Sequence, residues 1–256
     1  MKQVVAFTKK EFMELTRSGK LYLLIGIFFI LGIMNPALAK LTPFLFEMLS
    51  ESLKEQGIMV IEVSVTAMTS WEQYYKNLSM EFIVFVIMFC GIFTSEYQKG
   101  TLINVLTKGL SRWKVVLSKS IIMILTWTLC YWLCFGVTYV YNAYFWDNSI
   151  AQNIIFAASA SYLFGILLIA IIVLASSFMK TSSSVLLFTG GTYLVIYLLN
   201  MVVKLSKYLP IKLTSGLELL KGASLVSDYG LSILVTIILI IISFILAIIN
   251  FNRRKL

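Results

Sequence analysis

Five long runs of apolar residues constrain this chain more than any other feature of its sequence. They cover residues 21–39, 121–145, 154–178, 185–203 and 231–251, and each is 19 to 25 residues long. A helix of about 20 residues is roughly 30 Å long, which matches the hydrocarbon core of a bilayer. Charged residues make up only 13% of the chain, about half the share typical of a soluble domain. The chain is therefore expected to be an all-α protein that crosses a membrane several times.

A sixth span is weaker, and the distribution of basic residues decides whether it exists. Residues 82–95 are apolar, and extending the run back to Leu78 gives 18 residues, with Glu81 near one end of the span. With six spans and a cytoplasmic N-terminus, 14 of the 21 basic residues lie on the cytoplasmic side, whereas five spans leave only 9 there. Because cytoplasmic loops are enriched in Lys and Arg, we expect six spans, with the second over 78–95 and both termini in the cytoplasm.

Residue types that are missing or confined to apolar runs exclude several kinds of chemistry. The chain has no histidine, so histidine-based triads, HExxH zinc sites and histidine proton relays are excluded. The three cysteines, Cys90, Cys130 and Cys134, all lie inside apolar runs, where packing is a commoner role than a disulfide or a metal site. We therefore expect no catalytic residues, no metal site and no bound cofactor in this chain.

The sequence also carries no evident energy source for transport. Ser18-Gly19-Lys20 lacks the upstream glycine of a phosphate-binding loop, because Glu14 stands at that position. The second span has ionisable groups only at its ends, Glu81 and Glu96, whereas ion-coupled carriers place such groups near the midplane. If the chain transports a solute, we expect the energy to come from another polypeptide.

The N-terminal segment, residues 1–20, is expected to be an amphipathic helix in the cytoplasmic interface of the membrane. Apolar and threonine residues cover one arc of it, and Gly19 would be the joint into the first span. A simple membrane anchor and an elbow that contacts a partner remain equally open. The arc comprises Val4, Val5, Thr8, Phe12, Leu15 and Thr16, and the opposite face holds Lys9, Lys10, Glu11, Glu14 and Arg17.

A basic loop at residues 96–119 interrupts two strongly apolar runs and must lie outside the hydrocarbon core, on the cytoplasmic side. Residues 100–108 have helical character, and Gly109 is suited to end that helix with a left-handed residue. Ser111 can then cap a new helix that leads into the third span. The loop could equally be an orientation signal with an incidental helix.

Two segments on the opposite side of the membrane are expected to form short external helices. In 40–77, an amphipathic helix would follow Pro43 and close at Gly57, and the aromatic residues of 70–75 would form an interfacial belt. In 204–230, a surface or re-entrant helix with Leu213, Leu217 and Leu220 on one side would end at Gly222.

Over its whole length, 1–256, the chain resembles the single-domain transmembrane (permease) subunit of a small bacterial ABC-2 type transporter. The local match is Glu96-x-x-x-Gly100-Thr101, followed by Gly109-Leu110-Ser111-Arg112 and then by Lys119 at the entry to the third span. The family usually has a proline near the Ser-Arg turn, and this chain has Gly109-Leu110 there.

The resemblance implies a multi-pass protein of the bacterial cell membrane that works as a homo- or heterodimer of permeases. It also implies cytoplasmic ABC ATPase subunits, which would bind the ATP and magnesium, and contact with membrane lipid but not with nucleic acid. The loop 96–119 would carry the coupling helix that docks on the ATPase, with the elbow helix beside it through Phe12, Leu15 and Arg17. The residues expected at the coupling site are Glu96, Lys99, Gly100, Thr101, Leu102, Val105, Leu106, Lys108, Gly109, Ser111 and Arg112.

By the same resemblance, spans two and five would line the transport pathway at the centre of the dimer. The expected function is export of an amphipathic or apolar solute, peptides included, by a chain that is not itself an enzyme. A non-transporting membrane scaffold or sensor and a membrane enzyme are the alternatives. The expected pathway residues are Phe85, Phe89, Gly190, Gly191, Tyr193 and Tyr197.

Overall fold

The computed structural model describes residues 2–54, 65–102, 107 and 109–254, and every regular element within them is helical. Six of the helices are long and apolar enough to cross a membrane, which confirms the expected fold class. The elements are α1 (Lys2–Arg17), α2 (Lys20–Lys54), α3 (Ala67–Phe89), α4 (Thr94–Gln98), α6 (Arg112–Phe145), η1 (Asn148–Ile150), α7 (Ile154–Phe178), α8 (Ser182–Leu199), α9 (Val203–Ser206), η2 (Pro210–Thr214), α10 (Gly216–Leu220), η3 (Val226–Tyr229) and α11 (Gly230–Arg253).

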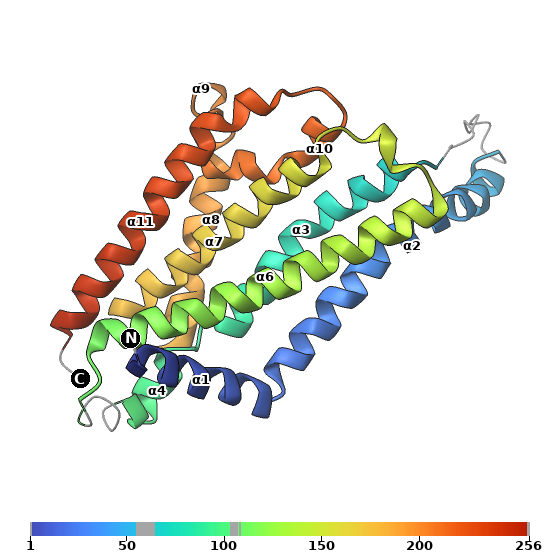
Figure 1. Ribbon diagram of the computed structural model, residues 1–256. Helices are drawn as coiled ribbons and strands as arrows, with labels where there is room; N and C mark the ends of the chain where they lie inside the picture. The colour runs from blue at the N-terminus through green and yellow to red at the C-terminus, as the bar shows by residue number, and fades with distance from the viewer. Residues whose placement is uncertain (1, 55–64, 103–106, 108, 255–256) are drawn as a thin grey trace.

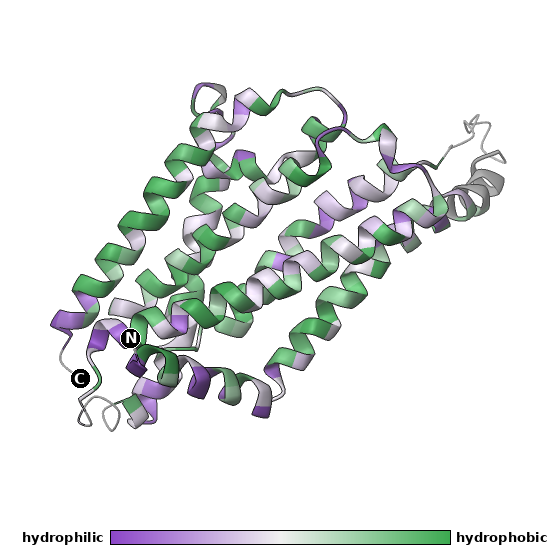
Figure 2. Cartoon of the chain, in the orientation of Figure 1, coloured by the Kyte–Doolittle hydropathy of each residue, from purple (hydrophilic) through white to green (hydrophobic). Residues whose placement is uncertain are grey.

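The long helices form one bundle whose two termini lie at the same end (Figure 1). Helix α2 packs along α6 and α3, and α11 packs along α7. Helix α1 lies across the end of the bundle that carries both termini, and hydrophilic residues gather there (Figure 2). An even number of spans places both termini on one side of a membrane.

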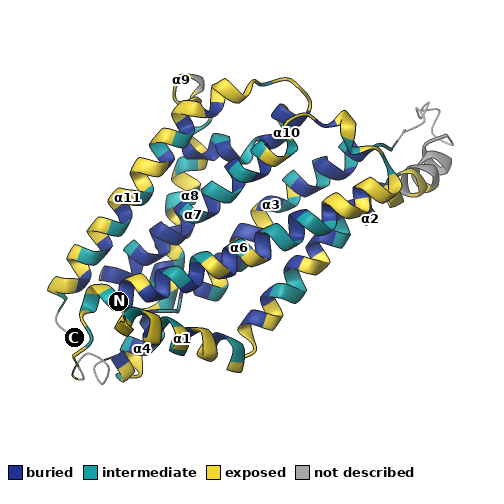
Figure 3. Ribbon diagram, viewed as in Figure 1, coloured by how far each residue is buried: buried dark blue, intermediate teal, exposed yellow. Residues whose placement is uncertain are grey.

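Helix α7 is the most enclosed element, whereas α8 and α11 are largely exposed (Figure 3). Small residues let α7 approach its neighbours closely, as at Gly165, where an added Cβ would lie 2.3 Å from the indole ring of Trp127 on α6. On α8, by contrast, an added Cβ at Gly190 or Gly191 would meet no described atom within 4 Å. One face of α8 is therefore free of contacts within this chain.

The first span does not end where the sequence predicted. A span at 21–39 and a separate helix after Pro43 were expected, but α2 continues without a break through Pro36 and Pro43. Proline keeps a helical φ and removes only one backbone donor, and membrane helices tolerate that loss where neighbours satisfy the freed carbonyl. The predicted end at Gly57 lies outside the described residues.

The second span also differs from its prediction over 78–95. Helix α3 begins at Ala67 and ends at Phe89, and a turn separates it from α4. The prediction of an interfacial belt at 70–75 was wrong for Trp71 and Tyr74, which are completely buried. Trp71 packs on Phe135 with ring centroids 5.6 Å apart, and its indole N–H donates to Asn148 Oδ1 at 3.2 Å. The rings are buried because the indole donor has a partner inside the protein.

The early start of α3 moves Glu81 from the mouth of the span to the middle of the helical unit that runs from Ala67 to Gln98. The other spans keep their expected positions with shifted ends. Helix α6 begins nine residues before the predicted 121–145, and α7 matches 154–178. Helices α8 and α11 shift by one to four residues at each end relative to 185–203 and 231–251.

Within the segment 204–230, the three leucines lie on two short pieces, η2 and α10, in place of the single helix that the leucine spacing predicted, and α9 and η3 lie on either side of these pieces. Leu213 and Leu220 are fully buried against the bundle, while Leu217 is half-buried. At Gly216, which separates the pieces, an added Cβ would lie 2.4 Å from the Tyr75 ring. This close packing against α3 explains the break.

Candidate functional site

Helix α1 binds the bundle through a face that the sequence did not single out. Its buried residues are Phe7, Glu11 and Leu15, which recur every fourth position and pack on α6. Val5 and Phe12, which belong to the apolar arc expected to hold the helix, are 68% and 49% exposed. In a membrane interface such apolar side chains can face lipid, so the protein-facing side need not be the more apolar one.

Lys119, near the start of α6, is the centre of a buried ion-pair cluster. Its side chain is only 1% exposed, and its Nζ lies 2.7 Å from Glu11 Oε2 on α1 and 3.1 Å from Glu96 Oε2 on α4. These three charged groups come from three elements that are far apart in the sequence. An isolated buried ammonium group would be strongly unfavourable, and here the side chain of Lys119 has two carboxylate partners.

Lys10 closes the cluster on its solvent side. Its Nζ lies 2.8 Å from Glu96 Oε1, 2.9 Å from Glu11 Oε1 and 2.9 Å from Glu14 Oε2. Partial burial lowers the pKa of Lys10, but the hydrogen bonds to Glu96, Glu14 and Glu11 outweigh it, so the pKa is raised above 10.5. The hydrogen bond from Lys10 also holds the pKa of Glu14 below 4.5. We refer to Lys10, Glu11, Glu14, Glu96 and Lys119 as the ion-pair cluster.

The three carboxylates of the ion-pair cluster approach one another closely enough to raise the question of a metal. One oxygen each of Glu11, Glu14 and Glu96 lies within 4.8 Å of the others. The ammonium groups of Lys10 and Lys119 bond to the same carboxylates, which balances most of their charge. The arrangement is that of a structural charge network that ties α1 and α4 to α6.

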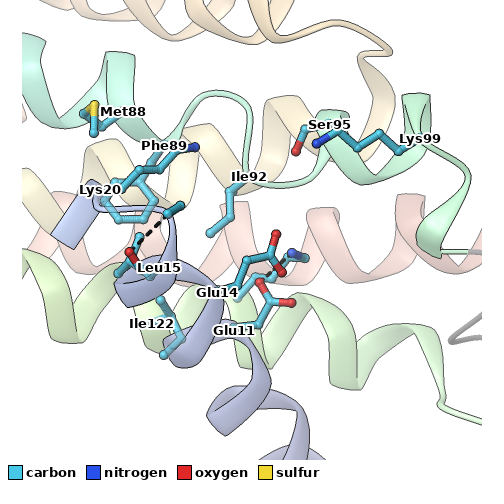
Figure 4. A pocket seen from close by; sticks show the side chains of 12 residues that line it. Glu11, Glu14, Leu15, Lys20, Met88, Phe89, Ile92, Ser95, Lys99 and Ile122 are labelled. Atoms are coloured by element: carbon cyan, nitrogen blue, oxygen red, sulfur yellow. Dashed lines mark hydrogen bonds and ion pairs between the residues drawn. The ribbon is translucent and has the colours of Figure 1, made fainter.

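A cavity of about 230 Å³ lies against the ion-pair cluster, between α1, the end of α3, α4 and α6. Figure 4 shows Glu11 and Glu14 side by side on α1, with Lys99 on the α4 side of the cavity. Apolar side chains, among them Met88 and Phe89, form the wall toward the bundle. The cavity leaves room for α1 and α4 to shift relative to each other.

The basic loop begins directly after the cluster. Gly100 has a φ of +66° and Gly109 a φ of +88°, values that L side chains rarely adopt. Thr101 donates to the Glu96 carbonyl at 3.4 Å, and Leu102 is buried at 2% exposure. Thr101, Leu102 and Thr107 are helical, while Val105, Leu106 and Lys108 lie outside the described residues. The two glycines therefore bracket the segment in which the sequence predicts a coupling helix.

Other predicted coupling residues have contacts within the chain or lie on its surface. Ser111 occupies the N-cap position of α6, but its side chain makes no capping hydrogen bond. Arg112, expected to face a partner, instead donates to the carbonyl of Phe251 at 3.3 Å and to that of Asn252 at 3.1 Å, in the last turn of α11. Lys99 is exposed and free to meet a partner.

Of the three predicted elbow residues, one also packs within the chain and two lie on its surface. Leu15 is buried against the bundle, whereas Phe12 and Arg17 are exposed. Lys114 of α6 donates to Gln3 Oε1 at 2.6 Å, and Ser118 donates to the Val4 carbonyl at 3.3 Å. These bonds and the ion-pair cluster hold both halves of α1 against the start of α6.

The predicted pathway residues fall into two separate groups. Phe85 and Phe89 lie inside the bundle, with their ring centroids 4.6 Å apart and the Phe85 ring 5.1 Å from the Trp127 ring. Gly190 and Tyr193 instead line an apolar groove of about 300 Å³ between α3, α7 and α8.

Gly191 and Tyr197 are exposed on α8. The structure thus brings Gly190 and Tyr193 together at the groove beside α8. Phe85 and Phe89, on α3, lie apart from them inside the bundle.

Sequence reasoning missed the roles of Lys10 and Glu11, which it placed on the solvent face of the N-terminal helix. One signal could have indicated Glu11: it lies in line with Phe7 and Leu15 at helical spacing. An acidic residue within an apolar stripe predicts a buried partner.

Six membrane-length helices, of which α7 is the most enclosed, and a charged end that carries both termini define a multi-pass membrane protein. The family model for ABC-2 family transporter proteins matches residues 5–256, and the chain belongs to this family. Members are permease subunits of ABC transporters and have no ATP site of their own. A comparison with curated proteins found no match.

Proposed function

We propose that this chain is the permease subunit of an ATP-driven exporter in the bacterial cell membrane, with both termini in the cytoplasm. Separate ATPase subunits bind ATP and magnesium and dock on the loop 96–119. The solute is amphipathic or apolar, peptides included, because the described interior of the bundle offers few charged groups to a polar solute.

The ion-pair cluster is the observation that carries this proposal. Glu96 is the first residue of the loop 96–119 and Lys119 is its last, and the two are joined by an ion pair of 3.1 Å. Glu11 adds α1 to the same cluster. A force applied to the loop therefore reaches α4 and α6 together, which is the mechanical connection that a coupling element needs.

The free face of α8 supports a dimer of permeases. A Cβ added at Gly190 or Gly191 would meet no described atom of this chain within 4 Å, although paired small residues in membrane helices commonly allow close helix contact. A second permease against α8 would bury them and place the apolar groove beside Tyr193 near the dimer centre.

The decisive experiment separates docking from coupling. The chain is co-expressed with a candidate ABC ATPase subunit, purified, and reconstituted in proteoliposomes. We expect Glu96→Gln to insert and co-purify with the ATPase normally, but to lower substrate-stimulated ATP hydrolysis by about tenfold, the equivalent of one charge-assisted hydrogen bond. Glu218→Gln, a change of the same kind on an exposed helix at the opposite end of the bundle, is the matched control.

Two results would argue against the proposal. Undiminished stimulation in Glu96→Gln would show that the ion-pair cluster does not transmit force. ATPase binding without any solute transport by the wild-type chain would favour a scaffold or sensor instead.

A further inference from the structure

A ladder of polar side chains runs through the middle of the bundle, between helices α2, α3 and α6. On α3 the polar residues recur at helical spacing, and on α6 they occur at every fourth position, so each set lies on one face. Most of them are fully buried. The ladder comprises Ser70, Tyr74, Asn77 and Glu81 on α3, Thr126, Cys130, Cys134, Thr138 and Asn142 on α6, and Asn35 on α2.

Two rungs of this ladder are joined by hydrogen bonds. In one, Asn77 Nδ2 donates to Asn35 Oδ1 at 2.8 Å, and Asn35 Nδ2 donates to Thr138 Oγ1 at 3.1 Å. In the other, one turn further along, Cys134 Sγ donates to Glu81 Oε1 at 3.2 Å. The rungs are four residues apart on both antiparallel helices, and Cys134 lies near the middle of α6's apolar run.

Glu81 has no charged partner in this position. Its side chain is completely buried, its Oε2 has no hydrogen-bond partner among the described residues, and no ion pair there includes it. The ionisable groups that face it are neutral weak acids: Tyr74 and Tyr75 on its own helix, and Cys130, Tyr131 and Cys134 on α6. A carboxylate without a cation at membrane depth is strongly unfavourable, so the carboxyl group of Glu81 carries its proton here.

The surroundings of Glu81 differ toward the two ends of the bundle. On the side of the ion-pair cluster, the neighbours of Glu81 on α3 are aromatic, and Phe82 and Phe85 lie 5.6 Å and 5.1 Å from the ring of Trp127. Toward the opposite end, the rings of Trp71, Tyr74 and Phe135 also pack together, but polar side chains continue alongside them to Asn142 and to the bond between Trp71 and Asn148. Water that follows polar groups would therefore reach Glu81 from the end at η1.

We propose that Glu81 is a membrane-embedded proton-binding site, which is protonated while α3 packs on α6 and loses its proton when the seam between them opens toward η1. In that step the O–H bond of the carboxyl group breaks, its electron pair stays on the carboxylate, and the proton passes to water in the opened seam. The open conformation is consequently favoured at higher pH. The inference does not depend on the identity of the ATPase or of the solute.

The first test detects the proton directly on the purified full-length chain by infrared difference spectroscopy. A protonated carboxyl group has a C=O stretching band that shifts on exchange into deuterium oxide. We expect this band at pH 7 in the wild type, its loss in Glu81→Gln, and its retention in Glu218→Gln, which changes an exposed carboxylate. A wild type without the band at pH 7, or an unchanged band in Glu81→Gln, would overturn the proposal.

The second test measures the coupling between the proton and the packing of α3 on α6. A folded state that holds a proton which the unfolded state releases is stabilised less as the pH rises. The thermal midpoint of the wild type should therefore fall as the pH rises above the ordinary pKa of a glutamate, about 4.3, and Glu81→Gln should lose that fall. An identical pH dependence in the two proteins would refute the coupling.

A third measurement keeps the proposal testable if Glu81→Gln does not fold. In the Cys90→Ala, Cys130→Ala background, alkylation of Cys134 by a neutral maleimide reports opening of the seam. We expect labelling of Cys134 to rise with pH more steeply when Glu81 is present than in Glu81→Leu. Equal pH profiles in both backgrounds would count against the proposal.

Discussion

Lys119 and Glu11 are 108 residues apart in the chain, yet their Nζ and Oε2 atoms are 2.7 Å apart and both side chains are buried. The pair joins the N-terminal helix to the beginning of α6, at the point where the basic loop re-enters the bundle. Helix α1 is therefore a bound part of the bundle end. Movements of the loop must strain this pair or carry α1 along.

Replacing Lys119 with methionine should strongly destabilise the chain. The change leaves Glu11 and Glu96 buried without a shared cation, and loss of one partner of a buried ion pair typically costs about 3–5 kcal/mol. The measurement is the thermal midpoint in detergent. Lys99→Met, which removes an exposed lysine from the same end, should change stability by less than about 0.5 kcal/mol. Equal effects of the two changes would mean that the pair contributes little.

Two glycines should respond in opposite ways to the same substitution. Gly165→Ala places a Cβ 2.3 Å from the Trp127 ring and should destabilise the chain by about 1–3 kcal/mol through overpacking. Gly190→Ala meets no described atom of this chain and should leave the stability of the isolated chain unchanged or slightly raised. Unfolding in detergent tests both, and a larger loss for Gly190→Ala would contradict the packing described for α7 and α8.

A larger substitution at Gly190 tests the proposed dimer. If a second permease packs on this face of α8, Gly190→Trp should lower dimer formation, measured by cross-linking in membranes, without lowering the stability of the monomer. Tyr144→Trp, on an exposed position of α6, is the control for an added indole. An unchanged dimer fraction would place the interface elsewhere.

Gly100→Pro should abolish transport while the spans still insert. Gly100 has a φ of +66°, whereas proline is held near −65°, so the chain cannot leave α4 in its present direction. Gly100→Asn is the control, because asparagine tolerates a left-handed φ and keeps the N–H that donates to the Tyr97 carbonyl at 3.1 Å, so this variant should still transport. Export by the Gly100→Pro chain equal to that of the wild type would contradict the prediction.

Acid should weaken the ion pair that Lys10 and Glu14 form within α1. The hydrogen bond from Lys10 lowers the pKa of Glu14, so its stabilisation is present above 4.5 and is lost as the pH falls below that value. Lys10, whose pKa is raised, keeps its charge throughout the neutral range. Because the pair is exposed and lies within one helix, its loss should lower the thermal midpoint in detergent only slightly. Glu14→Gln should remove this part of the acid dependence, and an unchanged dependence in that variant would contradict the prediction.

The extent of the membrane-spanning helices could be predicted only in part. The apolar runs predicted five spans, because a helix must remain apolar across the hydrocarbon core, and the distribution of basic residues added the sixth. They could not predict that α2 continues through Pro43 or that α3 begins at Ala67, because a polar or aromatic residue beyond the core is compatible with both helix and loop. Contacts with neighbouring helices decided those ends.

Much of the candidate site could also be located from local signals. The position of the basic loop and the turns at Gly100 and Gly109 follow from charge and from backbone freedom, and both glycines have positive φ values. The contacts of Arg112 could not be predicted in this way, because its acceptors are carbonyls at the end of α11, about 140 residues away in the chain.

The sequence by itself determined that the chain is an all-helical membrane protein of six spans with a basic loop after the second. Hydropathy and the charge of loops are local properties, and they determine segment by segment which part of the chain lies in the bilayer and which side each loop faces. Only the tertiary structure decided which side chains face the protein. In water, the buried face of a helix is the apolar one. In a membrane, lipid and protein interior are equally apolar, so hydropathy cannot separate Phe12, which is exposed, from Phe7, which is buried. The packing of α3, α6 and α1 decides which face of each helix points into the protein. The pairing of Lys119 with Glu11 and the position of Glu81 opposite Cys134 both depend on which face that is.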